Sequence, residues 1–116
     1  FYPMDAAQES IPLNGLWQAL IADWRSNLPI SILSARFHNS IVHLSVQISD
    51  QIRVRTGCAV VALSGGVWQN QYLLTHTVDQ LNAAGFKVLT HHQVPANDGC
   101  IALGQALVAA RSLQGA

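Results

Sequence analysis

The fold class of this chain follows from one short segment, Cys58-Ala59-Val60-Val61-Ala62-Leu63-Ser64-Gly65-Gly66. Its continuous apolar run, bounded by glycines, is typical of a strand buried on both faces in a parallel sheet. A second short apolar segment, Phe86 to Thr90, predicts another strand. Between them, apolar residues at helical spacing predict a helix that Gly85 ends. Strand, helix and strand so close together predict a βαβ unit with parallel strands.

Helices are predicted on both sides of this unit. The apolar residues of 14–25 and 30–56 recur at helical spacing, with Asn14 as an N-terminal cap and Gly57 as a C-terminal one. A last helix is predicted from Ile101 onward, and residues 1–13 form an irregular lead-in. We therefore expect the α/β class with the order α-α-β-α-β-α. Because two parallel strands make a poor sheet, further strands are expected outside this sequence.

The composition predicts a surface that something else covers. Of the 116 residues, 50% are hydrophobic and 10% are charged, whereas an average soluble domain carries about a quarter charged residues. Either the protein is rather apolar throughout, or part of its surface is normally covered by something else, and we favour the second explanation. Six basic residues balance six acidic ones without any run of like charge. Nucleic acid and anionic membranes are therefore not expected as partners.

The cysteines and the first residues bear on location. Cys58 and Cys100 lie far apart without a CxxC spacing, which favours a reducing compartment over a disulfide framework, so we expect a cytoplasmic protein. No apolar run approaches the roughly 20 residues that span a bilayer. The start, residues 1–5, lacks the features of a signal peptide. Since the first residue is Phe1, we expect a piece of something longer.

The glycine pair Gly65-Gly66 is the first candidate site. It follows the first predicted strand at its carboxyl end, where open α/β sheets bind their ligands. Adjacent glycines let the backbone approach a ligand closely, and the amides that begin the next helix suit an anion such as phosphate. The glycines could equally make only a tight turn from strand to helix, because the segment is neither a full GxGxxG nor a P-loop. Both interpretations stay open.

The segment Pro95-Ala96-Asn97-Asp98-Gly99-Cys100 is the second candidate site. It follows the second predicted strand, so it should reach the same edge of the sheet as the glycine pair. A carboxylate there could hold a divalent metal beside a phosphate, since hard cations prefer oxygen ligands. By position, a helix-capping role for Asn97 or Asp98 is favoured. The two roles can coexist.

The histidines and tryptophans are weaker candidates. His38 and His43 are five residues apart and would point about 140° away from each other on a helix, so they cannot share an ion. We expect all five histidines to serve at the surface or in packing. Trp17 and Trp24 are expected as core or interface anchors. Trp68 could border a nucleotide or pack beneath the glycine turn.

Three segments together resemble the C-terminal end of HypF-type carbamoyltransferases. They read VALSGGVWQN at 61–70, PANDG at 95–99 and IALGQA at 101–106, and ARFHN at 35–39 is similar to part of that family's long helix. The resemblance covers about residues 14 to 112. It implies a large multidomain enzyme whose last domain has the fold of actin, the sugar kinases and Hsp70 and is similar to the tRNA threonylcarbamoyl transferase. Residues 14–116 would be the C-terminal piece of this nucleotide-binding domain.

The resemblance also implies a reaction. The family uses carbamoyl phosphate and ATP to make carbamoyl adenylate, then passes the carbamoyl group to the C-terminal cysteine of a partner maturation protein. That partner produces the thiocyanate from which nickel-iron hydrogenases obtain cyanide ligands. A piece of this length is expected to be inactive alone and to self-associate. The alternatives are a stand-alone helical interaction or dimerisation module, or a related O-carbamoyl or tRNA threonylcarbamoyl transferase.

Four residues carry over from the family's motifs, none of them identified as catalytic. Gly65 and Gly66 match the turn that approaches the nucleotide phosphates, and Asn70 matches a polar contact to the nucleotide. Asp98 matches an aspartate that binds a divalent metal of unspecified identity. Cys100 departs from the pattern, because a second glycine usually stands there. Its side chain is expected to crowd the metal side of the site.

Overall fold

The computed structural model describes residues 1–2 and 11–114. In chain order, the elements are α1 (Asn14–Arg25), α2 (Ile30–Thr56), β1 (Val60–Ala62), η1 (Gly66–Gln69), α3 (Gln71–Ala83), β2 (Lys87–Leu89), η2 (Asp98–Cys100) and α4 (Ile101–Gln114), where η1 and η2 are single 3-10 turns. The predicted α/β class and the order α-α-β-α-β-α are thus confirmed. Residues 3–10 of the predicted lead-in lie outside the described residues.

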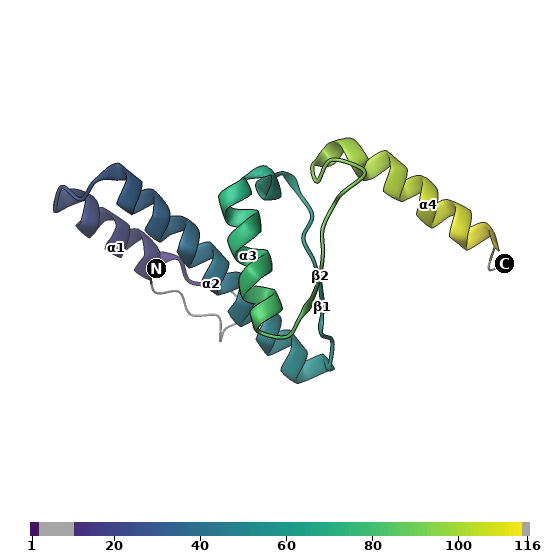
Figure 1. Ribbon diagram of the computed structural model, residues 1–116, viewed down its shortest axis with the longest axis horizontal. Coiled ribbons are helices and arrows are strands. Elements are labelled where there is room, and N and C mark those ends of the chain that lie inside the picture. Colours follow the sequence, from purple (N-terminus) through teal and green to yellow (C-terminus); the bar gives the residue numbers. More distant parts are fainter. Residues whose placement is uncertain (3–10, 115–116) are drawn as a thin grey trace.

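The molecule is elongated, with extents of 61 × 31 × 25 Å. α1 and α2 form a helical pair at one end, α3 lies between α2 and the two strands, and α4 projects from the other end (Figure 1). The radius of gyration is 17.3 Å, well above the roughly 13 Å of a compact domain of this length. Side chains of α4 are exposed along its whole described length, including Leu103, Leu107 and Val108. This shape agrees with the expected apolar surface that another part covers.

Glycines end two helices as the sequence predicts, but Asn14 does not cap α1. Gly57 takes a left-handed conformation (φ 73°) after α2, and its N–H donates to the Arg53 carbonyl. Gly85 has φ 82° just beyond α3. The N-cap of α1 is Leu13, whose carbonyl accepts from the Trp17 N–H at 3.0 Å. Asn14 is therefore already helical, and its side chain makes no capping bond.

The two strands pair in parallel, in the register Val60 with Lys87, Val61 with Val88 and Ala62 with Leu89. Val61 and Val88 are partly buried against the core between the sheet and α3. Val60 is 48% exposed and Leu89 47% exposed. The prediction of a strand buried on both faces is thus wrong for the part of the chain that the structure describes. An apolar run shows that both faces suit burial but not that this segment supplies both covers.

The buried core lies where α2, α3 and the strands meet. Leu63, Leu81 and Phe86 are its buried members, and Val46 and Trp68 are among the partly buried side chains that pack against them. α3 is held between α2 and the sheet by this cluster. Trp17 and Trp24 lie outside it and are 49% and 66% exposed. They are therefore not core anchors, and their role as interface anchors stays a prediction. No helix in the described residues is both long and apolar enough to cross a membrane.

A polar network fastens α1 and Tyr2 to α2. The Asp23 carboxylate accepts from the Tyr2 hydroxyl at 2.9 Å and from the Arg36 guanidinium at 2.6 Å. The Tyr2 amide also donates to the Ser40 hydroxyl, which is fully buried. The hydrogen bond from Arg36, and then that from Tyr2, lower the pKa of the Asp23 carboxyl. The ionised form of Asp23 therefore stabilises this end of the fold.

Acid should release this network. A depressed folded pKa means that the stabilisation by Asp23 is complete above the ordinary carboxyl pKa of about 4 and is lost as the pH falls through the lower folded value. We expect NMR titration of the Asp23 side chain to give a pKa below the ordinary one. In Arg36→Gln, which lacks the charge, the pKa should move back toward it. An ordinary pKa in both proteins would show that the ion pair does not form in solution.

Candidate functional site

The two sequence motifs meet at the carboxyl edge of the sheet. The Gly65 N–H donates to the Ala96 carbonyl at 2.7 Å, and a Cβ on Gly66 would lie 4.0 Å from the Cβ of Asn97. Beside them, the Ser64 hydroxyl and His91 Nε2 are 2.9 Å apart. The expectation that both motifs reach one edge is confirmed. The glycine turn (residues 64–67) and the acidic loop (residues 95–99) thus form one surface.

The glycine turn has open space beside its backbone. Gly65 has φ 108° and ψ 159°, a conformation that is essentially restricted to glycine. No heavy atom of the described residues lies within 4 Å of the position that a Cβ on Gly65 would take. The N–H groups of Gly66 and Val67 belong to the first turn of η1, where a helix offers them no acceptor. This backbone can therefore approach an anion, although a tight turn alone would share the same conformation.

Of the two roles predicted for Asn97 and Asp98, the structure shows the capping role, and metal binding stays a prediction. Asn97 caps η2, because its Oδ1 accepts from the Gly99 N–H at 3.0 Å. Asp98 is exposed at the start of η2. A Cβ on Gly99 would lie 3.1 Å from Asn97 Oδ1, so the loop is tight at this position. The geometry leaves the Asp98 carboxylate accessible from solvent.

The residues of this surface could supply one protein ligand of a divalent metal site, but not a complete set. Within the described ranges no group of three or more His, Cys, Asp or Glu side chains could hold an ion. Mg²⁺ is commonly bound by one or two carboxylates together with phosphate oxygens and water. Asp98 could supply one such ligand beside a phosphate at the glycine turn. Cys100 Sγ lies 3.4 Å from the Asn97 carbonyl oxygen within its own turn, and the expected crowding of a metal stays a prediction.

Asn70 lies at the other end of η1 and is already engaged. Its Oδ1 accepts from the Leu73 N–H at 3.1 Å, which caps α3, and its Nδ2 is 2.9 Å from His38 Nε2. The structure therefore brings Gly65, Gly66 and the loop of Asp98 together, while the side chain of Asn70 contacts α2. Neither this contact nor the bond between Ser64 and His91 was predicted from the sequence.

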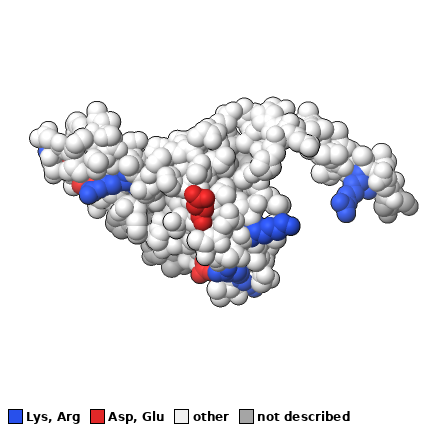
Figure 2. Space-filling model, viewed as in Figure 1, with Lys and Arg blue, Asp and Glu red and all other residues white. Residues whose placement is uncertain are grey.

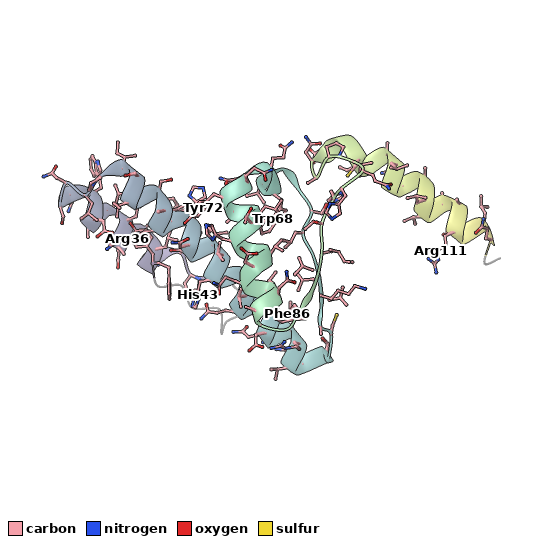
Figure 3. The ribbon with its side chains drawn as sticks, viewed as in Figure 1. Arg36, His43, Trp68, Tyr72, Phe86 and Arg111 are labelled. Carbon is pink, nitrogen blue, oxygen red and sulfur yellow. The ribbon has the colours of Figure 1, made fainter. Side chains whose placement is uncertain are left out.

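Of the two roles predicted for Trp68, the structure shows packing, and a contact with a nucleotide stays a prediction. Trp68 packs against the buried core and also lines a hollow of about 200 Å³ between the end of η1 and the loop after β2, together with His91 and Pro95. Figure 3 shows Trp68 between α3 and the strands. The face shown in Figure 2 carries scattered charges and no basic cluster. The site is thus an edge of mostly backbone and neutral groups, with Asp98 as its nearby carboxylate.

These features define a class of protein: an α/β subdomain with a glycine turn and an acidic loop at one edge of a parallel sheet. Residues 1–105 match the family described as "Carbamoyltransferase, Kae1-like Domain, second subdomain". The chain therefore belongs to the HypF-type carbamoyltransferase family, as its motifs suggested.

Relatives and a solved structure agree with this assignment. The chain is 35% identical to the carbamoyltransferase HypF of Synechocystis sp. over 90% of its length, and 54% identical to that of Rhodobacter capsulatus over 47%. It covers 14% and 7% of these two relatives. A crystal structure of full-length HypF in a phosphate- and nucleotide-bound form superposes with a TM-score of 0.94 at 35% identity, over 100% of this chain and 19% of that one. The chain thus spans a small part of each relative.

Proposed function

We propose that the chain is part of a longer HypF-type carbamoyltransferase and forms one wall of its nucleotide site. The observation that carries the proposal is the joining of the glycine turn to the acidic loop by the bond from the Gly65 N–H to the Ala96 carbonyl. The same arrangement of elements occurs in a HypF described as phosphate- and nucleotide-bound. A phosphate at the turn would contact backbone amides at Gly66 and Val67.

Each residue of the proposed site has a role that follows from its chemistry. Gly65 and Gly66 let the backbone come close to phosphate oxygens, and Asn70 offers a polar contact to the nucleotide. Asp98 would hold a divalent cation, which would supply charge neutralisation for the phosphates when bound. The opposite wall of the site and the catalytic residues would come from the rest of the enzyme. Alone, this wall should bind nucleotide weakly and catalyse nothing.

In the whole enzyme, the site would serve carbamoyl transfer through an adenylate. Hydrolysis of carbamoyl phosphate would release phosphate and carbamate, and attack of the carbamate oxygen on the α-phosphate of ATP would give carbamoyl adenylate and pyrophosphate. The carbamoyl group would then pass to the C-terminal cysteine thiolate of a partner maturation protein, with AMP as the leaving group. The product serves cyanide-ligand synthesis for nickel-iron hydrogenases. The two cysteines of the chain, Cys58 and Cys100, are both free, which fits the reducing cytoplasm in which we place the enzyme.

The exposed apolar surface fits this proposal better than a stand-alone module. α4, with Leu107 63% exposed and Leu113 82% exposed, and Trp24 of α1 present apolar side chains to solvent. A module that folds alone seldom leaves an entire apolar helix uncovered. Because the chain spans 14% of its Synechocystis relative, we assign this surface to contacts with the rest of the enzyme, and we expect the isolated chain to self-associate through it.

Calorimetric titration of the full-length enzyme with ATP tests the metal side of the proposal. In the presence of Mg²⁺, Asp98→Ala should lower the affinity by about tenfold, which is about 1.4 kcal/mol. With EDTA in place of Mg²⁺, the wild type and Asp98→Ala should bind equally. Asp79→Ala is the matched control, since Asp79 is an exposed carboxylate on α3 outside the site. Absence of saturable ATP binding, or equal effects of the two substitutions, would contradict the proposal.

A further inference from the structure

The ARFHN segment of α2, residues 35–39, contacts the start of α3, which follows the glycine turn and η1. Asn39 Oδ1 accepts from the Tyr72 hydroxyl at 2.9 Å, and the His38 ring lies edge-on to the Tyr72 ring with centroids 5.7 Å apart. His38 Nε2 is 2.9 Å from the Nδ2 of Asn70. These contacts join residues more than 30 positions apart in the chain, at the corner where η1 passes into α3. The corner is therefore fastened to the long helix.

The hydrogen bonds of His38 allow a single protonation pattern. Its Nδ1 lies 2.8 Å from the Ser34 carbonyl oxygen. Because a carbonyl can only accept, Nδ1 must carry a hydrogen. On the other side, the Nδ2 group of Asn70 can only donate, so His38 Nε2 must be the bare, accepting nitrogen. Both contacts are satisfied only by the neutral imidazole protonated at Nδ1.

The same logic fixes the amide of Asn70. The Leu73 N–H can only donate, so the atom that faces it at 3.1 Å must be the Asn70 oxygen. The acceptor on His38 holds the amide nitrogen on the opposite side. A reversed amide would place donor against donor at Leu73 and acceptor against acceptor at His38. After both bonds, Asn70 keeps one Nδ2 hydrogen and one Oδ1 lone pair for a ligand.

We propose that His38 is a positioning residue for nucleotide binding, which it serves by orienting the Asn70 amide. This inference rests on the proposed function, because it takes Asn70 as a contact of the nucleotide. In this inference His38 does not itself contact the nucleotide. Its contribution is to hold Asn70 in the single orientation that leaves one donor and one acceptor free, so that binding does not have to order the side chain.

ATP titrations of the full-length enzyme test the inference through rescue. His38→Leu removes the acceptor and should weaken ATP binding by about fivefold, the effect of one typical hydrogen bond. His38→Gln carries an amide oxygen that can replace Nε2 and should bind within about twofold of the wild type. His43→Leu is the control on the same helix, since His43 stacks on Phe1 with centroids 4.0 Å apart rather than on Asn70. It should leave the affinity unchanged.

A double-mutant cycle separates positioning from general stability. In an Asn70→Ala background, His38→Leu should have no further effect on affinity, because the group that it orients is gone. Thermal unfolding of each variant controls for loss of fold. If His38→Leu weakens ATP binding equally with and without Asn70, or His38→Gln binds as poorly as His38→Leu, the inference is overturned. Gly66→Trp, which obstructs the turn, distinguishes failure of this inference from failure of the proposed nucleotide site. If that variant binds ATP normally, the proposed function itself is wrong.

Discussion

Leu81→Ala should lower the free energy of unfolding of the chain by about 2–5 kcal/mol, as for other fully buried leucines. Leu81 lies on α3, is 0% exposed and belongs to the core cluster with Leu63 and Phe86. Truncation removes apolar contacts and leaves a cavity between α3 and the strands. Because this cluster joins α2, α3 and the sheet, its disruption should weaken the packing of all three.

Leu107→Ala on α4 is the matched control. Leu107 is 63% exposed, so in the monomeric chain its truncation should change the free energy of unfolding by no more than about 0.5 kcal/mol. Urea unfolding followed by circular dichroism measures both effects, at a protein concentration low enough to keep every variant monomeric. Equal losses for Leu81→Ala and Leu107→Ala would mean that α4 folds back onto the core, contrary to its projecting position (Figure 1).

The helices of this fold were predictable because their signals are local. The apolar spacing predicted 14–25 and 30–56, and α1 and α2 have these bounds. Gly57 ends α2 since its left-handed conformation is one that glycine adopts without strain. The cap of α1 was mistaken because a capping residue type at position 14 does not fix the residue at which the helix starts.

Coverage of the apolar faces was not predictable, because it depends on neighbours that a sequence pattern does not contain. Val60 and Leu89 are apolar and lie on the uncovered face of the sheet. The helical spacing of α4 likewise predicts a helix, but not what packs on it. The low charge content did predict such surface, since composition records the total area to be covered and not its position.

In the candidate site, too, some contacts were predictable from the sequence and others were not. Because carboxyl ends of parallel strands share an edge, the meeting of Gly65 with the loop after β2 followed from topology. The register Ala62 with Leu89, continued by two residues, also places Ser64 opposite His91, so that contact could have been found. The pair His38 and Asn70 carried no such signal, since it depends on how α2 packs against α3.

Gly66→Trp should lower the affinity of the full-length enzyme for ATP by at least about a hundredfold, which is about 2.7 kcal/mol. Unlike Gly65, Gly66 does not have a positive φ, so other residues can adopt its backbone conformation without strain. A Cβ there would meet the Asn97 Cβ at 4.0 Å, an ordinary contact. The indole of a tryptophan would extend from this position into the space where we place the phosphates.

Gly66→Ala separates obstruction from damage to the turn. Its methyl group fits beside Asn97, so ATP binding should fall by no more than about threefold, or about 0.7 kcal/mol. Calorimetric titration with ATP and Mg²⁺ on both variants and the wild type measures the difference. Similar, small effects of both substitutions would place the phosphates elsewhere. A large loss with tryptophan and a small one with alanine would show that ATP binding requires the open space beside Gly66, as a phosphate held against the glycine turn demands.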